Sequence, residues 1–79
     1  MKLMGWRTYL VMYFGSEVGM TEVSEKVESI GFVTTIGPVD FIYDWKGKVP
    51  SKKEILALGD RLAEVLRGTG AIFNLDTHD

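Results

Sequence analysis

The middle of the chain, residues 31–45, carries two apolar strand patterns on either side of a Gly37-Pro38 dipeptide. Proline lacks the amide hydrogen that a strand ladder requires, so we expect Pro38 in a turn between the strands. The first strand is predicted at 32–36 and the second at 39–45. A helical pattern lies on each side of this pair, which restricts the chain to folds in which helices and strands alternate.

Two helices are predicted from the spacing of apolar residues. The first stripe repeats at intervals of three, four and three residues and is followed by Gly31, which suits the left-handed conformation that ends many helices. The second stripe has the same intervals, follows a Ser51–Glu54 capping box and is ended by Gly68. The stripes consist of Met20, Val23, Val27 and Ile30, and of Ile55, Leu58, Leu62 and Val65. Both are expected to face the core.

Two further strands complete the order of elements. Residues 6–14 are rich in aromatic and β-branched side chains, and residues 71–76 form a shorter apolar segment before a polar tail at 77–79. The order is therefore β-α-β-β-α-β in a single domain that covers residues 1–79. With right-handed crossovers this order predicts a ferredoxin-like sandwich of the α+β class, in which a four-stranded antiparallel sheet has both helices on one face.

Alternation along the strands divides their side chains between the two faces of the sheet. The almost wholly apolar set is assigned to the helix side: Trp6, Leu10, Met12, Phe14, Val39, Phe41, Tyr43, Trp45, Ala71, Phe73 and Leu75. The other set mixes apolar and charged residues and is assigned to an open face: Arg7, Tyr9, Val11, Tyr13, Asp40, Ile42, Asp44, Ile72, Asn74 and Asp76. We expect a register in which Tyr9 pairs with Ile42, because it also sets Arg7 opposite Asp44.

The open face carries too many apolar side chains for a surface exposed to water and too many charges for a core. Surfaces of this kind commonly meet a partner or a ligand. The sequence therefore predicts a non-enzymatic assembly or ligand-sensing module that forms a homo-oligomer, most simply a dimer, with a small molecule as a possible ligand. The candidate ligand-binding residues are Arg7, Tyr9, Tyr13, Asp40, Asp44, Asn74 and Asp76.

A few glycines and one aspartate carry a resemblance to known families. Gly37 and Asp40 match a Gly-x-x-Asp turn that opens the third strand, and Gly68 or Gly70 matches a helix end before the last strand. In this layout the chain resembles dimeric ferredoxin-like α/β-barrel domains, namely the Gly-Tyr-Asp-containing small proteins and the ligand-sensing domains of Lrp/AsnC-type regulators. It departs from them at Val39, where those families favour tyrosine. The chain also resembles small archaeal ferredoxin-like proteins. The resemblance implies dimerisation through the open sheet face, and it does not imply catalysis.

Two other functions remain open at this point. An enzyme of the dimeric α/β-barrel kind, monooxygenase-like or isomerase-like, would depend on Asp40, Asp44 or a tyrosine, because the chain has no cysteine and one histidine, His78. Single-stranded RNA could stack on Tyr9 and Tyr13. The aspartates of the same face would repel its phosphates, and the net charge of −2 gives no electrostatic footprint for nucleic acid. We therefore expect no nucleic-acid partner. No catalytic residue is assigned, and the enzymatic alternative stays open.

Two polar clusters have groups that can bind ions. Asp76, His78 and Asp79 carry metal-ligand atoms, but chain ends are commonly disordered, so no metal and no cofactor is predicted. A basic cluster consists of Lys46, Lys48, Lys52 and Lys53. It suits an anion or an acidic partner, although a solvated loop and first helical turn is the expectation.

The location of the protein is predicted from what the chain lacks. No apolar stretch approaches the ~20 residues that span a bilayer, and the first residues do not form a signal peptide. We therefore predict a cytoplasmic protein without membrane contact. The chain has no glutamine and one asparagine, Asn74, and this scarcity of thermolabile residues favours a thermophilic source.

Overall fold

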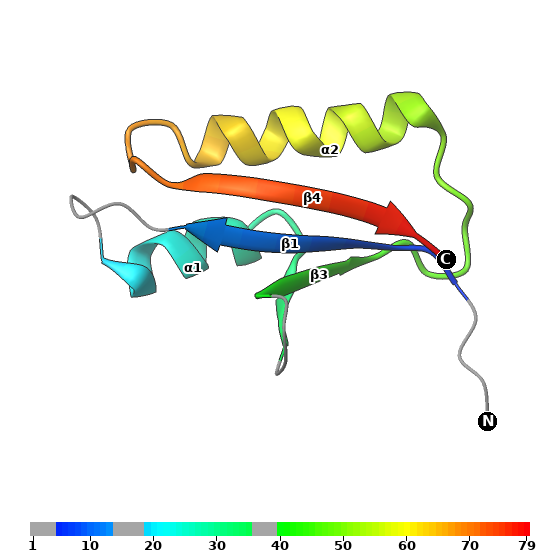
Figure 1. The fold of residues 1–79 in the computed structure, drawn as a ribbon, viewed down its shortest axis with the longest axis horizontal. Helices are drawn as coiled ribbons and strands as arrows, with labels where there is room; N and C mark the ends of the chain where they lie inside the picture. Colours follow the sequence, from blue (N-terminus) through cyan, green and yellow to red (C-terminus); the bar gives the residue numbers. More distant parts are fainter. Residues whose placement is uncertain (1–4, 14–18, 36–39) are drawn as a thin grey trace.

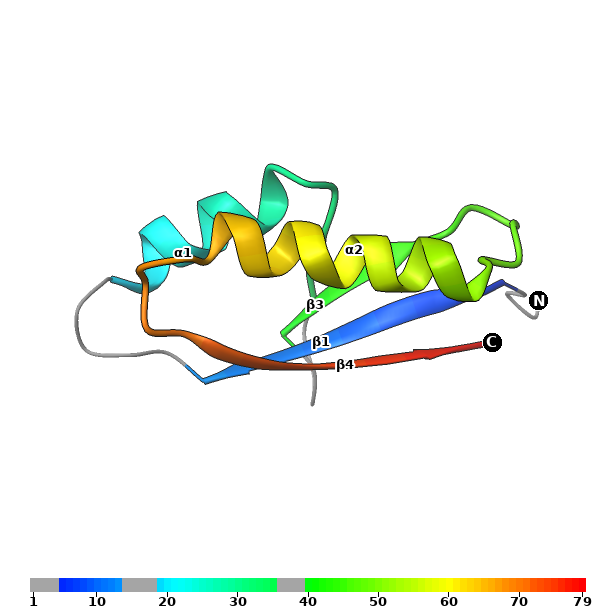
Figure 2. The same ribbon diagram turned by 90° about the horizontal axis from the view of Figure 1, so that it is seen from above.

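The computed structural model describes residues 5–13, 19–35 and 40–79. Within these ranges the elements follow in the order β1 (Arg7–Tyr13), α1 (Met20–Glu28), β2 (Val33–Thr34), β3 (Phe41–Asp44), α2 (Lys52–Val65) and β4 (Ile72–His78) (Figure 1). The four strands form one antiparallel sheet in the order β2-β3-β1-β4. Both helices lie on the same side of this sheet (Figure 2). The protein is thus the α+β ferredoxin-like sandwich that the sequence predicts.

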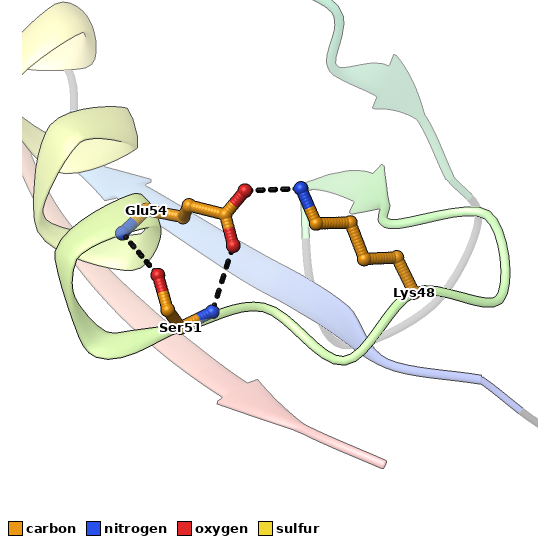
Figure 3. Close-up of polar contacts among 3 residues, drawn as sticks. All are labelled: Lys48, Ser51 and Glu54. Atoms are coloured by element: carbon orange, nitrogen blue, oxygen red, sulfur yellow. Dashed lines mark hydrogen bonds and ion pairs between the residues drawn. The ribbon is translucent and has the colours of Figure 1, made fainter.

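The ends of the helices follow from local hydrogen bonds. At the start of α2 the Ser51 hydroxyl accepts a hydrogen bond from the Glu54 amide (3.1 Å), and the Glu54 carboxylate accepts one from the Ser51 amide (2.9 Å). The predicted capping box is therefore confirmed (Figure 3). The α1 helix begins after Gly19 without a side-chain cap and ends at Glu28. Gly31 then adopts a positive φ of 109°, which suits its predicted place at the end of the helix.

The hydrophobic core lies between the helices and one face of the sheet. Its buried side chains are Leu10, Met12, Val23, Val27, Phe32, Phe41, Leu58, Leu62 and Leu66. Further side chains pack against it from the sheet: Tyr43, Trp45, Ala71, Phe73 and Leu75. The predicted helix side is thus confirmed for the described residues except Trp6, which is half-buried and lines a surface hollow with Gly47 and Val49.

Met20 was predicted in the core stripe of the first helix, and this prediction was wrong. The side chain is 64% exposed. Met20 is the first residue of α1, and helical side chains lean toward the N-terminal end of their helix. The side chain therefore leans away from the body of the helix, whereas Val23 and Val27 are buried one and two turns later.

The last strand is longer than predicted. The sequence predicts a polar tail at 77–79, but β4 continues to His78. The prediction was wrong because Thr77 finds a polar partner within the sheet, where its hydroxyl lies 2.7 Å from that of Thr8. Thr8 is fully buried and also accepts a hydrogen bond from the Trp45 indole (2.9 Å). This polar cluster joins the start of β1 to the end of β4.

The register between β1 and β3 is the predicted one. Tyr9 pairs with Ile42, and Arg7 pairs with Asp44. Some of the predicted strand residues lie outside the described ranges, namely Phe14, Ile36, the Gly37-Pro38 turn and Val39. The confirmed register fixes which side chains share the face that the helices leave uncovered.

Candidate functional site

The candidate site is the face of the sheet that no described helix covers (Figure 2). Cross-strand pairing arranges its side chains in rows. The rows are Asp44–Arg7–His78, then Val33–Ile42–Tyr9–Asp76, then Val11–Asn74, and last Tyr13–Ile72. Since the first row carries charged groups and the last row is apolar, the open face has a charged end and an apolar end.

The apolar end exposes large side chains to water. Tyr13 is 58% exposed, and its cross-strand neighbour Ile72 is 68% exposed. Val33 lies on the same face two rows away, on the edge strand β2, and is 58% exposed. Ile42 is half-buried beside Val33 in its row, and the half-buried Val11 lies in the next row toward Tyr13. Apolar surface that is spread over neighbouring strands in this way is typical of a contact site.

The charged end is organised around Arg7, which lies between Asp44 and His78 in its row. In the described part of the chain, the ion pairs are formed by Lys48, Arg67 and His78. The Arg7 guanidinium therefore has no carboxylate of a described residue within 4.0 Å. Asp44 instead accepts a hydrogen bond from the Lys46 amide (2.8 Å) in the turn after β3. The Arg7 guanidinium is therefore available to a carboxylate or phosphate from another molecule.

His78 belongs to this face, which the sequence analysis missed. Its ring stacks on Tyr9 with centroids 4.5 Å apart and planes 14° apart, and its Nε2 atom lies 3.7 Å from a carboxylate oxygen of Asp76. The signal was the alternation of β4, which continues through residue 78 once the tail is recognised as strand. Val33 was missed because the second strand was assigned to neither face, although it pairs with Ile42.

Asp40 was predicted as a ligand-binding residue, and the structure gives its carboxylate a backbone partner. The carboxylate accepts a hydrogen bond from the Met12 amide (2.8 Å), and the Asp40 amide donates to the Leu10 carbonyl (2.9 Å). Asp40 therefore extends the pairing with β1 to the residue that precedes β3. One carboxylate oxygen of Asp40 is thus engaged by a backbone amide, in the same way that the Lys46 amide engages Asp44.

The other predicted candidates fall into two groups. Arg7, Tyr9, Asp44 and Asp76 come together in two adjacent rows at the charged end. Asn74 lies in the next row, opposite Val11, and Tyr13 lies in the apolar row. The structure thus brings most of the candidates to one end of one face.

Asp76, His78 and Asp79 carry the metal-ligand atoms near the carboxyl-terminal end of β4. A carboxylate oxygen of Asp79 accepts a hydrogen bond from the Gly5 amide (3.3 Å). Across residues 5–13, 19–35 and 40–79, no group of three or more histidine, aspartate or glutamate side chains is placed to hold a metal ion.

Comparison with known proteins finds no matching family model, no matching curated protein and no matching solved structure. The resemblance to Lrp/AsnC-type and Gly-Tyr-Asp-containing domains therefore stays a prediction. Neither of the described helices combines the length and the apolar character needed to cross a membrane.

Proposed function

We propose that this protein is a non-enzymatic assembly or ligand-sensing module that forms a homo-oligomer, most simply a dimer, through its open face. One observation carries the proposal: Tyr13, Val33 and Ile72 are each more than half exposed on the face that no described helix covers. A partner that covers this face would remove these apolar side chains from water, which favours association. A cytoplasmic location and a thermophilic archaeal source, both inferred from the sequence, accompany the proposal as predictions.

The distribution of charge supports a second copy of this chain as the partner. In a two-fold pairing the same patch serves both copies, so it must be complementary to itself. An axis along the strands brings apolar end to apolar end and charged end to charged end. Because the charged end carries both signs, Arg7 of one copy can approach Asp44 or Asp76 of the other copy.

A sensing role would place a small ligand between the two copies at the charged end, beside Arg7, Tyr9 and Asp44, because Tyr13 lies in the apolar row at the other end of the face. Arg7 supplies an unpaired cation in the described structure, and the Tyr9–His78 stack supplies a flat wall. This arrangement supports an anionic or planar ligand at the charged end, where the two copies would exclude water.

The test compares two lysine substitutions at similarly exposed apolar positions. Ile72→Lys introduces a charge into the apolar end of the open face, whereas Leu56→Lys introduces it on α2, where Leu56 is 59% exposed. Size-exclusion chromatography with light scattering should give dimers for the wild type and Leu56→Lys, and a monomer for Ile72→Lys. Equal behaviour of the two variants would contradict the proposal.

Native mass spectrometry of the purified protein distinguishes a ligand-sensing role from a purely structural one. A dimer that carries a constant extra mass would identify the class of ligand and support sensing. A bare dimer would support a purely structural role. A bare monomer at high protein concentration would overturn both.

A further inference from the structure

A groove lies on the helix side of the sheet, opposite to the open face. It has a volume of about 310 Å³ and runs between α2 and the end of β3. Its lining includes Tyr43, Trp45, Lys48, Glu54, Ala57 and Arg61. A second hollow of about 270 Å³ adjoins the same two aromatic side chains. Tyr43 and Trp45 therefore lie between the groove and the second hollow, on the side of the sheet where the helices pack.

The groove results from the unequal lengths of the helices. The α1 helix has nine residues and α2 has fourteen, and α1 lies beside the C-terminal half of α2 only (Figure 2). Over the end of β3 the helix layer is consequently one helix wide. Tyr43 and Trp45 stay half-buried there, although they belong to the apolar side of the sheet.

The two aromatic rings are fixed in place by their neighbours. The Trp45 indole donates to the buried Thr8 hydroxyl (2.9 Å). The Tyr43 ring meets Trp45 edge-on at 4.8 Å and Phe32 edge-on at 5.4 Å. A Cβ at Gly31 would lie 3.0 Å from the Tyr43 ring, so the glycine allows the turn to pass against it. The rings thus form a wall that needs little rearrangement to receive a ligand.

The charges of the groove favour an anion. Lys48 and Glu54 form an ion pair with each other, and Glu54 also accepts a hydrogen bond from the Ser51 amide (Figure 3). Arg61 makes no hydrogen bond or ion pair with any other described residue. Since Lys48 offsets Glu54, the lining keeps one unpaired positive charge, and its planar guanidinium can bind a carboxylate through two parallel hydrogen bonds.

We propose that this groove binds a small aromatic carboxylate, with its ring against Tyr43 and Trp45 and its carboxylate on Arg61. The volume is at the lower end of the ~300–1,000 Å³ that is usual for small-molecule sites, which suits a ligand with a single ring. The faces of the aromatic rings would also attract a cation. The unpaired charge of Arg61 opposes a cation, however, and selects the anion.

The first test is a titration followed by NMR, with three probes that share a six-membered ring. Benzoate has the ring and the anion, benzylamine has the ring and a cation, and cyclohexanecarboxylate has the anion without the aromatic ring. Benzoate should cause saturable shifts of the Trp45 indole resonance and bind at least tenfold more tightly than the other two. Saturation by benzylamine at equal concentration, or no saturation by benzoate, would overturn the proposal.

Paired variants then locate the site. Ala57→Leu fills the groove and should weaken benzoate at least tenfold, whereas Ala63→Leu makes the same change at an exposed position of α2 outside the groove lining. Arg61→Gln should weaken benzoate similarly, and Arg67→Gln should not. An unchanged affinity in Ala57→Leu and Arg61→Gln would place any binding elsewhere and refute the site. All four variants should retain the oligomeric state of the wild type, so this proposal and the open-face proposal fail independently.

Discussion

The two faces of the sheet are built from alternate residues of the same strands, but they differ in what covers them. On β1, Leu10 and Met12 are 0% and 5% exposed beneath the helices, while the neighbouring Tyr13 is 58% exposed on the other face. On β4, Phe73 is half-buried and Ile72 is 68% exposed. Apolar residues therefore occur on both faces, and the position of the helices decides which of them form the core. Those that remain are available for contact between molecules.

The largest effect is expected where the helices cover the sheet. Leu62 is fully buried, so Leu62→Ala should reduce the free energy of unfolding by about 2–5 kcal/mol through lost burial and the cavity that remains. Leu56→Ala on the same helix should cost less than about 0.5 kcal/mol, because Leu56 is 59% exposed. Urea unfolding measures both, and similar losses would mean that the covered face is wrongly placed.

Thr8 is a buried polar residue on the covered face, and its hydroxyl is hydrogen-bonded. Thr8→Val should cost about 1–3 kcal/mol, because it leaves the Trp45 indole donor without its partner. Thr77→Val should cost less, since Thr8 would still accept from Trp45. Equal losses in urea unfolding would show that the Thr8–Trp45 hydrogen bond does not stabilise the fold.

The parts of the fold that the sequence predicts are those with local causes. The capping box depends on Ser51 and Glu54, which are three residues apart, and the stripe of α2 repeats within one helix. The extension of β4 could not be predicted in this way. It depends on a contact between the hydroxyls of Thr8 and Thr77, which are 69 residues apart, and the alternation of residues 72–78 alone does not show that this partner is present.

The capping box of Ser51 and Glu54 stabilises the first turn of α2, where the helix follows its preceding loop. Ser51→Ala removes the acceptor of the Glu54 amide and should cost about 1 kcal/mol. Ser24→Ala, in the middle of α1, removes a serine without a capping role and should be close to neutral. Thermal unfolding of the two variants should differ in this order, and the reverse order would contradict the role of the cap.

A smaller change in the free energy of unfolding is expected when acid protonates Glu54 of this cap. The hydrogen bond from Lys48, followed by that from the Ser51 amide, lowers the pKa of Glu54 from its ordinary value of 4.5. A carboxyl group whose pKa is lower in the folded chain stabilises the fold above its unfolded pKa, and this stabilisation is lost as the pH falls through the folded pKa. Stability should therefore decline below about pH 4.5. Lys48→Met should flatten that decline in urea unfolding, whereas Lys53→Met should leave it unchanged.

The candidate sites show the same division between local and distant causes. Alternation and register predict the gathering of Arg7, Tyr9 and Asp44, because both follow from the strand pattern. The engagement of Asp40 with the backbone of β1 depends on a hydrogen bond between residues that are 28 positions apart in the sequence. The groove beside Arg61 was not predicted either, since its lining combines residues of β3 and α2 that are distant in the sequence.

The most direct test of the open face as a contact between copies is sedimentation equilibrium of the wild-type chain over a wide range of concentrations. The account predicts a species of twice the chain mass whose fraction rises with protein concentration. A single species with the mass of one chain at every concentration would contradict it, because the exposed Tyr13, Val33 and Ile72 would then remain in contact with water.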